Sequence, residues 1–400
     1  RSWQTMTGER PIQFDFLAPA RVVFGWGRRS EVGHLARSLG NRAFLVSGSR
    51  SLERSGAIAQ LIDLLFTAGL TAVPLVTIAH EPLVADVDGA VERLLKSDPV
   101  AGDLIIAIGG GSAIDLAKAV AALATNRHGS GVADFLEGLG KGLKVEIPPL
   151  PVLAMPTTAG TGSEATKNAV ISSTDPPFKK SLRSELMVPR IVVIDPELTV
   201  NLPPDVTAHT GMDAITQLIE SYLSRRAQPI PQALAQSGLQ FALRSIETAV
   251  ADGSNRESRE GMAFAAFLSG MALANSGLGL AHGVAAALGI HCGVPHGLAC
   301  AMMLPAALRI NREVRRNEIA RLWTLLNDAR LVDEDQAADR FIARIDELAH
   351  RIGIPSRLSQ IGVLHDQIPA LVKGSRGNSM DGNPRDVSDE ELGRLLEEML

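Results

Sequence analysis

Three of the nine histidines, His282, His291 and His296, lie in one stretch of sequence that carries no charged side chain. The stretch runs from Gly261 to Leu308 and contains no Asp, Glu, Lys or Arg, so we expect it to be buried. A buried imidazole needs partners, because its ring has both a hydrogen-bond donor and an acceptor. A shared divalent metal ion would satisfy several histidines at once, whereas separate core histidines bonded to ordinary neighbours are the alternative.

A predicted helix ahead of this stretch carries Asp213, Gln217 and Glu220 at positions i, i+4 and i+7. Side chains at this spacing lie on one face of a helix. Such a face is ordinarily solvated surface, which is the alternative interpretation. This helix face would form part of a metal site if it packed against His282 and His296, because a carboxylate and two imidazoles form a typical set of metal ligands.

A glycine-rich turn joins an apolar segment, Asp103 to Ile108, to a predicted helix, Ala113 to Leu123. The turn consists of Gly109, Gly110, Gly111 and Ser112. Glycines let backbone N–H groups approach a phosphate closely, and a helix N-terminus adds a partial positive charge. A tight turn without a ligand is the alternative. The position between a strand and a helix favours a pyrophosphate-binding loop.

A second loop of small residues follows the apolar segment 152–155. It spans residues 156–164 and is rich in threonine and glycine, which leave room for a ligand. Thr161 and Glu164 have the spacing of a capping box, so we expect a helix to begin here. A ligand loop and a helix start are compatible interpretations.

Strand-like and helix-like segments alternate over the first half of the chain, and this alternation predicts a mainly parallel sheet. The expected strands are residues 11–25 (an edge strand or hairpin), 43–46, 72–78, 103–108, 152–155 and 190–196. One expected helix ends near residue 68, and two others span residues 84–95 and 113–123. From Thr199 onward nearly all periodicity is helical. We therefore expect an α/β domain over residues 1–197 and an all-helical domain over residues 198–400.

Length and charge narrow the classes of function. A chain of 400 residues exceeds what one core ordinarily supports, which agrees with two domains. The net charge of −5 gives no general electrostatic footprint for nucleic acid or an anionic membrane, so neither partner is expected. Both cysteines, Cys292 and Cys300, lie in the uncharged stretch, which suits a reducing compartment better than a disulfide framework. The first residues show no signal-peptide pattern, so we expect a cytoplasmic protein.

Five motifs occur in one order along the chain. They are GGGSxxDxxK at residues 109–118, PTTAGTGSE at 156–164, TGMDA at 210–214, AHG at 281–283 and PHG at 295–297. In this order they resemble the iron-containing (group III) alcohol dehydrogenase family over essentially the whole chain. The resemblance implies a dehydroquinate synthase-like architecture: a Rossmann-like α/β N-terminal domain that binds NAD or NADP, and an all-α C-terminal domain. That second domain would hold one divalent metal, Fe²⁺ or Zn²⁺, with the substrate between the two.

The resemblance also implies roles for individual residues. The cofactor-binding residues would be Gly48, Ser49, Gly109, Gly110, Gly111, Ser112, Asp115, Thr157, Thr158, Asn168 and Lys179. The metal ligands would be Asp213, Gln217, His282 and His296. Three of these ligands, Asp213, His282 and His296, are also the expected catalytic residues, together with His291.

Two positions near the expected metal depart from the family pattern. Gln217 stands where most relatives have a His ligand, although one branch of the family also has Gln. An amide oxygen suits Fe²⁺ or Zn²⁺ less well than an imidazole nitrogen does, so weaker metal binding is expected. Ala286 stands where many relatives have a His that is thought to help move the alcohol proton. His291 is a candidate to move the alcohol proton instead. The alternative is that His291 is an ordinary core residue.

The adenosine end of the expected cofactor site departs from the pattern as well. Many relatives that use NAD have an Asp after the strand that ends here at Val46, where it holds the ribose hydroxyls. This chain has Gly48 there, followed by Ser49 and Arg50. Loss of the carboxylate removes a repulsion toward a 2′-phosphate, so the sequence is compatible with NADP as well as NAD as the cofactor.

These features predict an oxidoreductase, an NAD(P)-dependent alcohol dehydrogenase that interconverts a small primary alcohol and its aldehyde by metal-assisted hydride transfer. A maleylacetate-type reductase with a dispensable metal and a non-catalytic, metal-free relative are the alternatives. A dehydroquinate-synthase-like lyase is disfavoured, because no cluster of basic residues for a phosphorylated substrate lies near the metal motifs. The expected partners are the small-molecule substrate and further copies of the chain, in a dimer or larger homo-oligomer.

Overall fold

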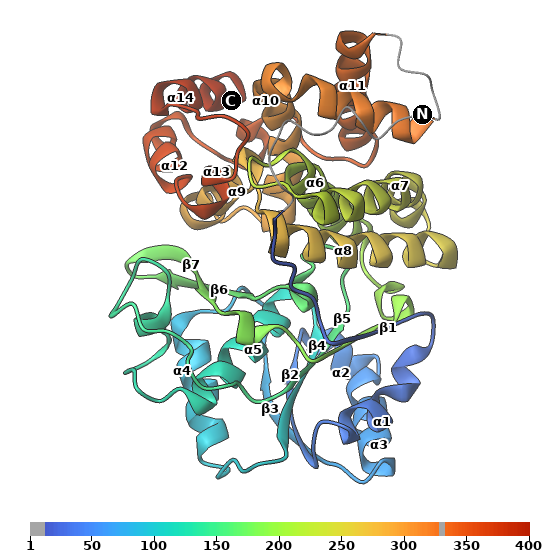
Figure 1. Cartoon of the computed structure of the whole chain (residues 1–400), viewed down its shortest axis with the longest axis vertical. Helices are drawn as coiled ribbons and strands as arrows, with labels where there is room; N and C mark the ends of the chain where they lie inside the picture. The colour runs from blue at the N-terminus through green and yellow to red at the C-terminus, as the bar shows by residue number, and fades with distance from the viewer. Residues whose placement is uncertain (1–12, 328–332) are drawn as a thin grey trace.

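The structure is a computed structural model that describes residues 13–327 and 333–400, and these form two regions (Figure 1). The lower region in Figure 1 is a six-stranded sheet flanked by helices, and the upper region is helical. The strands follow the order β1-β8-β5-β4-β2-β3, and every neighbouring pair is parallel. Their bounds are β1 Arg21–Phe24, β2 Arg42–Ser47, β3 Thr71–Thr77, β4 Asp103–Gly109, β5 Val152–Pro156 and β8 Ile191–Ile194. The expected Rossmann-like α/β arrangement followed by helices is confirmed.

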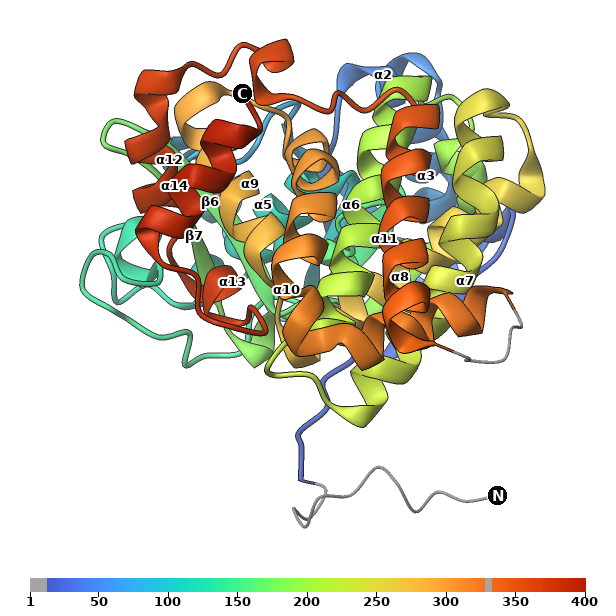
Figure 2. The same cartoon turned by 90° about the horizontal axis from the view of Figure 1, so that it is seen from above.

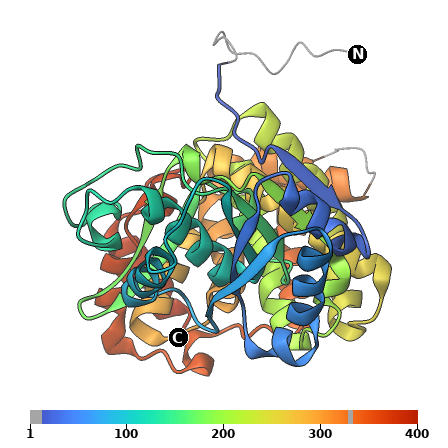
Figure 3. The same cartoon turned by 90° about the horizontal axis from the view of Figure 1, so that it is seen from below.

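Helices cover both faces of this sheet because its central strands are apolar on both sides. In β4, Ile105 and Ala107 join one buried cluster with α4 and α5, while Ile106 and Ile108 join another with α1 and α3. Alternate residues of a strand point to opposite faces, so a strand covered on both sides is a continuous apolar run. Figure 3 shows the helices on the two sides of the sheet. The helices of this region are α1 Val32–Arg37, α2 Arg50–Arg54, α3 Ala57–Thr67, α4 Val84–Leu95 and α5 Gly111–Thr125.

Of the two forms expected for residues 11–25, an edge strand or a hairpin, the structure has the edge strand: β1 pairs in parallel with β8, and no hairpin forms within the described residues. Residues 11 and 12 lie outside the described ranges, as do the first residues considered for a signal peptide. The helix start expected at residues 161–164 is wrong. Thr161 and Glu164 begin no α-helix. Gly162 adopts φ +60° against the backbone of Gly270, and only the three-residue turn η4 (Ser163–Ala165) follows.

An antiparallel hairpin was not predicted from the sequence. Its strands, β6 (Asn168–Thr174) and β7 (Pro177–Arg183), pair along their whole length. Most of their side chains are partly exposed and many are polar, so no clean alternation of apolar residues marks them. The hairpin reaches α9 (Leu280–Cys292) of the helical region, which brings residues from the two halves of the sequence side by side (Figure 1).

The helical region is built around α6 (Pro204–Leu223), which is buried along most of its length. This helix packs against α7 (Pro229–Ala251), α8 (Arg256–Ser276) and α10 (His296–Asn327), as the view from above shows (Figure 2). The other helices are α11 Glu334–Arg351, α12 Ile368–Gly374, α13 Asn378–Asp381 and α14 Asp389–Glu398. The uncharged stretch lies in α8, α9 and α10 and is largely buried as expected, except near His291 at the exposed end of α9.

The junction between α8 and α9 is sharply bent. No single helix in the described ranges is long and apolar enough to cross a membrane, and α8 and α9 meet that criterion only as a pair that bends by 102°. The bend turns the start of α9 toward α6. There the carboxylate of Glu220 accepts hydrogen bonds from the backbone N–H groups of Gly279 (3.0 Å) and Ala281 (2.7 Å).

Candidate metal and cofactor site

A large cleft lies between the carboxyl ends of β4 and β5 and the helical region. Its volume is about 1430 Å³. Gly110 and Thr158 line it from the sheet, and Asp213, His282 and His296 line it from the helices. Ligands of open parallel sheets bind outside the carboxyl ends of the strands. The glycine-rich turn and the histidines identified in the sequence therefore face one space.

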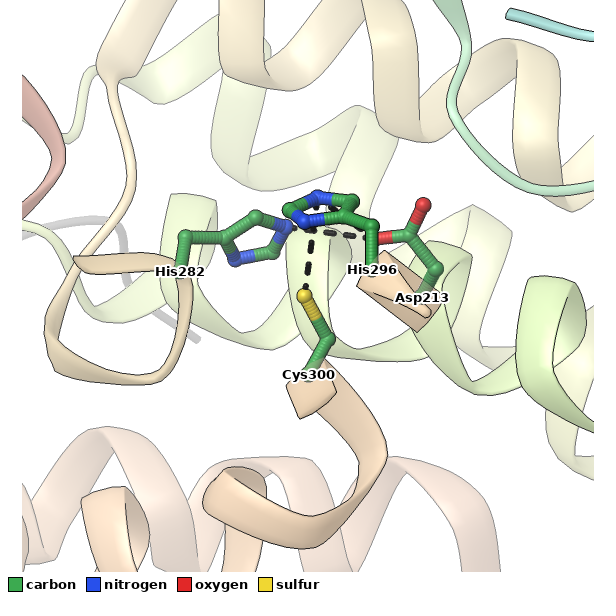
Figure 4. A group of neighbouring side chains, drawn as sticks. All are labelled: Asp213, His282, His296 and Cys300. Carbon is green, nitrogen blue, oxygen red and sulfur yellow. Dashed lines mark hydrogen bonds and ion pairs between the residues drawn. The ribbon is translucent and has the colours of Figure 1, made fainter. Parts of the chain in front are cut away.

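Four side chains on three helices bring possible metal-binding atoms together (Figure 4). Asp213 lies on α6, His282 on α9, and His296 and Cys300 lie at the start of α10. One atom from each lies within 4.8 Å of the others. Oδ1 of Asp213 is 3.2 Å from Nε2 of His282 and 3.9 Å from Nε2 of His296. Carboxylate, imidazole and thiolate are ligands that Zn²⁺ and Fe²⁺ accept, so the donor set fits a divalent metal.

Glu220 fixes the orientation of the His282 ring. Its Oε2 accepts a hydrogen bond from Nδ1 of His282 at 2.7 Å, and both side chains are buried. When Nδ1 carries the proton, Nε2 is left with the lone pair that binds a metal. Metal-binding histidines commonly donate their other ring N–H to a carboxylate in this way. Glu220 is therefore a positioning residue, a role that the sequence alone did not reveal.

The surroundings favour the metal-binding forms of Asp213 and His296, whereas His282 has to lose a proton when a metal binds. Burial lowers the pKa of His282, but the acidic side chains around it raise that pKa well above 6.5. Burial alone would raise the pKa of Asp213, but the hydrogen bond from His282 and the nearby histidines lower it below its ordinary value. Burial and the charge of Lys179 lower the pKa of His296 to about 4. The carboxyl group is thus ionised and the His296 ring neutral at pH 7, which are the protonation states that coordinate metals.

Gln217 lies beside the metal-binding group with both ends of its amide hydrogen-bonded. Its Nε2 donates to Oδ1 of Asp213 at 3.0 Å. Its Oε1 accepts from the hydroxyl of Ser269 at 2.6 Å. The nitrogen, which has no lone pair for a metal, is therefore the end that faces Asp213. The predicted role of Gln217 as a ligand stays a prediction.

The glycine-rich turn is shaped by close approaches on both of its sides. A Cβ at Gly109 would lie 2.9 Å from the Cα of Gly48, and a Cβ at Gly111 would lie 2.5 Å from Oγ1 of Thr161. Gly110, Gly111 and Ser112 line the cleft at the start of α5. A side chain at these positions would fill the space in front of the helix N-terminus. The turn fits the pyrophosphate of a dinucleotide.

A smaller depression lies at the carboxyl end of β2, next to Gly48. Its volume is about 550 Å³, and Ser49, Arg50, Arg54 and His80 are among the residues that line it. The described lining residues include no carboxylate. Ser49 precedes the first residue of α2, with the β2 carboxyl end behind it. This place corresponds to the adenosine end of the expected cofactor site.

Asp115 and Thr157, two of the expected cofactor residues, make contacts within the fold, and Asp115 also lines the cleft. The carboxylate of Asp115 accepts from the backbone N–H of Val170 at 2.9 Å and pairs with Nζ of Lys118 at 3.1 Å, so it ties α5 to β6. Thr157 is buried, and its backbone N–H donates to the carbonyl of Gly109 at 3.0 Å. Both positions hold the loops that line the cleft. Neighbouring Thr158 lines the cleft itself.

The hairpin brings Asn168 and Lys179 to the cleft. Oδ1 of Asn168 is buried and has no hydrogen-bond partner in the described part of the chain, so an acceptor is available for a ligand. Nζ of Lys179 pairs with Glu81 at 2.6 Å. Both residues lie on the cleft wall, as expected of cofactor contacts.

His291 lies on the cleft wall but outside the metal-binding group. It sits near the end of α9, is exposed, and approaches Gly374: a Cβ there would lie 3.0 Å from Nε2 of His291. Ala286 also lines the cleft, one turn earlier on the same helix. The structure thus brings Asp213, His282 and His296 together and leaves His291 apart from them.

Fold and site together fit one class of protein, the dinucleotide-dependent dehydrogenases, because the glycine-rich turn and the metal-binding group face one cleft. The family model described as "Iron-containing alcohol dehydrogenase" matches residues 19–196, and that described as "Fe-containing alcohol dehydrogenase family, C-terminal" matches residues 207–400. The chain belongs to the iron-containing alcohol dehydrogenase family. It is an NAD(P)-dependent oxidoreductase that interconverts alcohols and aldehydes and uses a metal ion.

Similar proteins match this chain over nearly its full length. The probable alcohol dehydrogenase EutG of Escherichia coli is 34% identical over 94% of this chain and 92% of its own. The NAD-dependent methanol dehydrogenase of Bacillus methanolicus is 30% identical over 96% of this chain and 100% of its own. A solved structure of 1,3-propanediol oxidoreductase superposes with a TM-score of 0.89 at 31% identity, covering 97% of this chain and 100% of that one.

Proposed function

We propose that the enzyme interconverts a small primary alcohol and its aldehyde in the cleft between the glycine-rich turn and the metal-binding group. One observation carries this proposal: Gly110 and Thr158 line the same cleft as Asp213, His282 and His296. Relatives that carry the names of methanol and 1,3-propanediol dehydrogenases support the choice of substrate class, because both names denote small primary alcohols.

The chain's own residues prepare this cleft for hydride transfer. Bound groups would supply Lewis-acid polarisation of the substrate oxygen and exchange of a hydride with the substrate carbon. Asp213, His282 and His296 would hold the metal, with Gln217 beside them. The N-terminus of α5 would hold the cofactor pyrophosphate, and Asn168, Lys179 and Thr158 would orient its nicotinamide end. Ala286 and Ile290 of α9 give this part of the cleft wall apolar side chains, which would strengthen electrostatic interactions at the substrate oxygen.

His291 is the residue that we assign to the passage of the alcohol proton to solvent. It lines the cleft and is exposed at the end of α9, whereas Ala286, one turn earlier, has no group that carries a proton. His291→Ala should lower the rate of alcohol oxidation and leave the protein's metal content unchanged. Unchanged oxidation rates across the pH range would remove His291 from the mechanism.

Turnover tests the proposed function directly. The purified enzyme is supplied with Zn²⁺ or Fe²⁺ and assayed by nicotinamide absorbance with NAD and NADP on a panel of alcohols and aldehydes, before and after chelation. We expect chelator-sensitive turnover of short primary alcohols. Full activity after complete metal removal would favour the maleylacetate-type reductase, and no turnover of any alcohol or aldehyde would reject the proposal.

Three further predictions concern organisation. We propose that the chain divides near Glu197 into a cofactor domain and a metal-binding domain, and the turn η6 (Pro196–Thr199) between β8 and α6 supports this division. We propose a cytoplasmic enzyme, supported by two free cysteines, Cys292 and Cys300. We propose a homo-oligomer, a dimer or larger, which light scattering on the purified protein tests.

A further inference from the structure

Cys300 lies in the second turn of α10, on the same face as His296. The two residues are four apart, and side chains at this spacing neighbour each other on a helix. Sγ of Cys300 is 3.7 Å from Nε2 of His296, and the side chain is fully buried. Figure 4 shows the sulfur directed at the point where the rings of His282 and His296 and the carboxylate of Asp213 converge.

The distances between these atoms have the dimensions of a metal site. Bond lengths of about 2.0–2.3 Å to a tetrahedral metal require its ligand atoms to lie about 3.3–3.7 Å apart. Three of the six distances among these four atoms are 3.2 Å (Asp213 to His282), 3.7 Å (Cys300 to His296) and 3.9 Å (Asp213 to His296), and the other three do not exceed 4.8 Å. The sulfur is therefore as close to Nε2 of His296 as a shared metal requires, and the longer distances would shorten as the metal binds.

The competing donor is turned away from this group. The amide oxygen of Gln217 is held by the hydroxyl of Ser269 at 2.6 Å, while its nitrogen faces Asp213. Gln217 can offer its oxygen only after the amide rotates and both hydrogen bonds are exchanged. The thiol of Cys300 already faces the two imidazoles and needs only to release its proton to solvent as the metal binds, against the burial that raises the pKa of the thiol to about 12.

We propose that Cys300 is a ligand of the metal, so that this enzyme holds its ion with Asp213, His282, His296 and a thiolate. The inference rests on the metal role in the proposed function and adds a donor to it. A thiolate is a soft ligand that selects Zn²⁺ over harder ions such as Mn²⁺. It also cancels one more charge of the 2+ ion, so the group with bound metal is formally neutral rather than +1.

The sulfur would bind the metal from the protein side. Asp213, His282 and His296 line the cleft, whereas Cys300 is not among the residues that line it. Cys300 would therefore add a donor to the metal without entering the space that a substrate occupies in the cleft. Gln217, which does line the cleft, would act through its hydrogen bond to Asp213.

Cobalt substitution tests the sulfur–metal bond without reference to turnover. The full-length protein is stripped with a chelator, reduced, loaded with Co²⁺ in the absence of nucleotide, and its near-ultraviolet spectrum is recorded. A thiolate bound to Co²⁺ gives a charge-transfer band there that nitrogen and oxygen ligands do not give. We expect this band in the wild-type protein and its loss in Cys300→Ala and Cys300→Ser.

Two control variants test whether the charge-transfer band comes from the sulfur of Cys300. Cys292→Ala removes the other cysteine, whose Sγ lies 3.5 Å from the Gln367 side chain, and Gln217→Ala removes the competing donor. Both should keep the band. Zn²⁺ affinity, measured against a chromophoric chelator, should fall more than about 100-fold in Cys300→Ala, since loss of even an outer partner of a ligand costs about 10- to 100-fold.

The wild-type spectrum decides the inference even if the variants fold poorly. Wild-type protein that binds Co²⁺ without a charge-transfer band overturns it, and so does a band that persists in Cys300→Ala. Failure to bind Co²⁺ at all also overturns it. A protein that shows the band but turns over no alcohol would leave Cys300 as a ligand and reject the proposed function instead.

Discussion

Oε2 of Glu220 lies 2.7 Å from Nδ1 of His282, and the same carboxylate accepts the backbone N–H groups of Gly279 and Ala281. One side chain of α6 therefore sets both the start of α9 and the direction of a metal-binding ring. A carboxylate is a strong hydrogen-bond acceptor, so this one side chain satisfies the ring N–H and both backbone N–H groups. The position of His282 thus depends on Glu220, which is not among the residues that line the cleft.

Glu220→Gln should weaken metal binding by about 10- to 100-fold, because partners of metal-binding histidines contribute that much to affinity. An amide accepts the Nδ1–H bond less strongly than a carboxylate does and adds a donor that the buried site cannot satisfy. Competition with a chromophoric chelator measures the change. Glu92→Gln, on the exposed face of α4, is the matched control. Equal affinities in the two variants would contradict the role of Glu220.

Asp115→Ala should lower the free energy of unfolding by about 3–5 kcal/mol, because it leaves the fully buried ammonium of Lys118 without its anionic partner. Urea denaturation measures the loss. Asp134→Ala, which removes a pair with exposed Lys141, should cost less, because Lys141 stays in contact with water. A small loss for Asp115→Ala, combined with a large increase in the KM of the cofactor, would show instead that Asp115 is a direct cofactor contact.

Burial raises the pKa of Glu164 from 4.5 to about 7 against the lowering effect of Lys118. The folded state thus binds a proton more tightly than the unfolded state does, so this stabilisation is complete below pH 4.5 and is lost as the pH rises through about 7. Glu164→Gln should remove the slope and make the protein up to about 3 kcal/mol more stable than wild type at alkaline pH. Denaturation series at several pH values test this, and parallel curves would contradict it.

Arg50→Ala should raise the KM for NADP by about ten- to hundredfold, the effect of losing a charged hydrogen bond, and change the KM for NAD little. Arg50 and Arg54 line the depression beside Gly48, and the described lining residues include no carboxylate to repel a 2′-phosphate. Steady-state kinetics with both cofactors measure the change. Arg37→Ala, on the exposed side of α1, is the control. Equal effects on NAD and NADP would exclude a 2′-phosphate contact.

The sequence predicted the parallel sheet and its loops well, because their signals are local. β4 is an uninterrupted apolar run that leads into glycines and a helix, and the close approach of Gly109 to Gly48 confirms why glycine is needed there. A shared metal was one of two interpretations of the uncharged histidine stretch, and only the order of the motifs assigned a full ligand set to it. Spacing on α6 placed Asp213 on one face, but only the packing of α6 against α9 and α10 brings His282 and His296 to it.

The features that were missed depend on tertiary packing. Cys300 in an apolar stretch has the pattern of an ordinary core residue, and its distance from His296 becomes meaningful only once His282 and Asp213 are in place. The Thr161–Glu164 capping pattern gave a false helix, because Gly162 packs on Gly270 and turns the chain instead. Local preference was overruled there by a contact with a helix far away in the sequence.

Gly110→Ala should weaken cofactor binding at least about tenfold. It should change the free energy of unfolding by no more than about 3 kcal/mol. Its backbone has φ −73°, which alanine adopts readily, and the new Cβ would lie 3.3 Å from Thr158 in the cleft, where the pyrophosphate is expected. Gly162→Ala is the converse control. At φ +60° and 2.4 Å from the Cα of Gly270, its Cβ would mainly reduce stability. Fluorescence titration with NADH and NADPH, paired with urea denaturation, separates the two effects. Unchanged affinity in Gly110→Ala would mean that the cofactor phosphates do not bind at the start of α5.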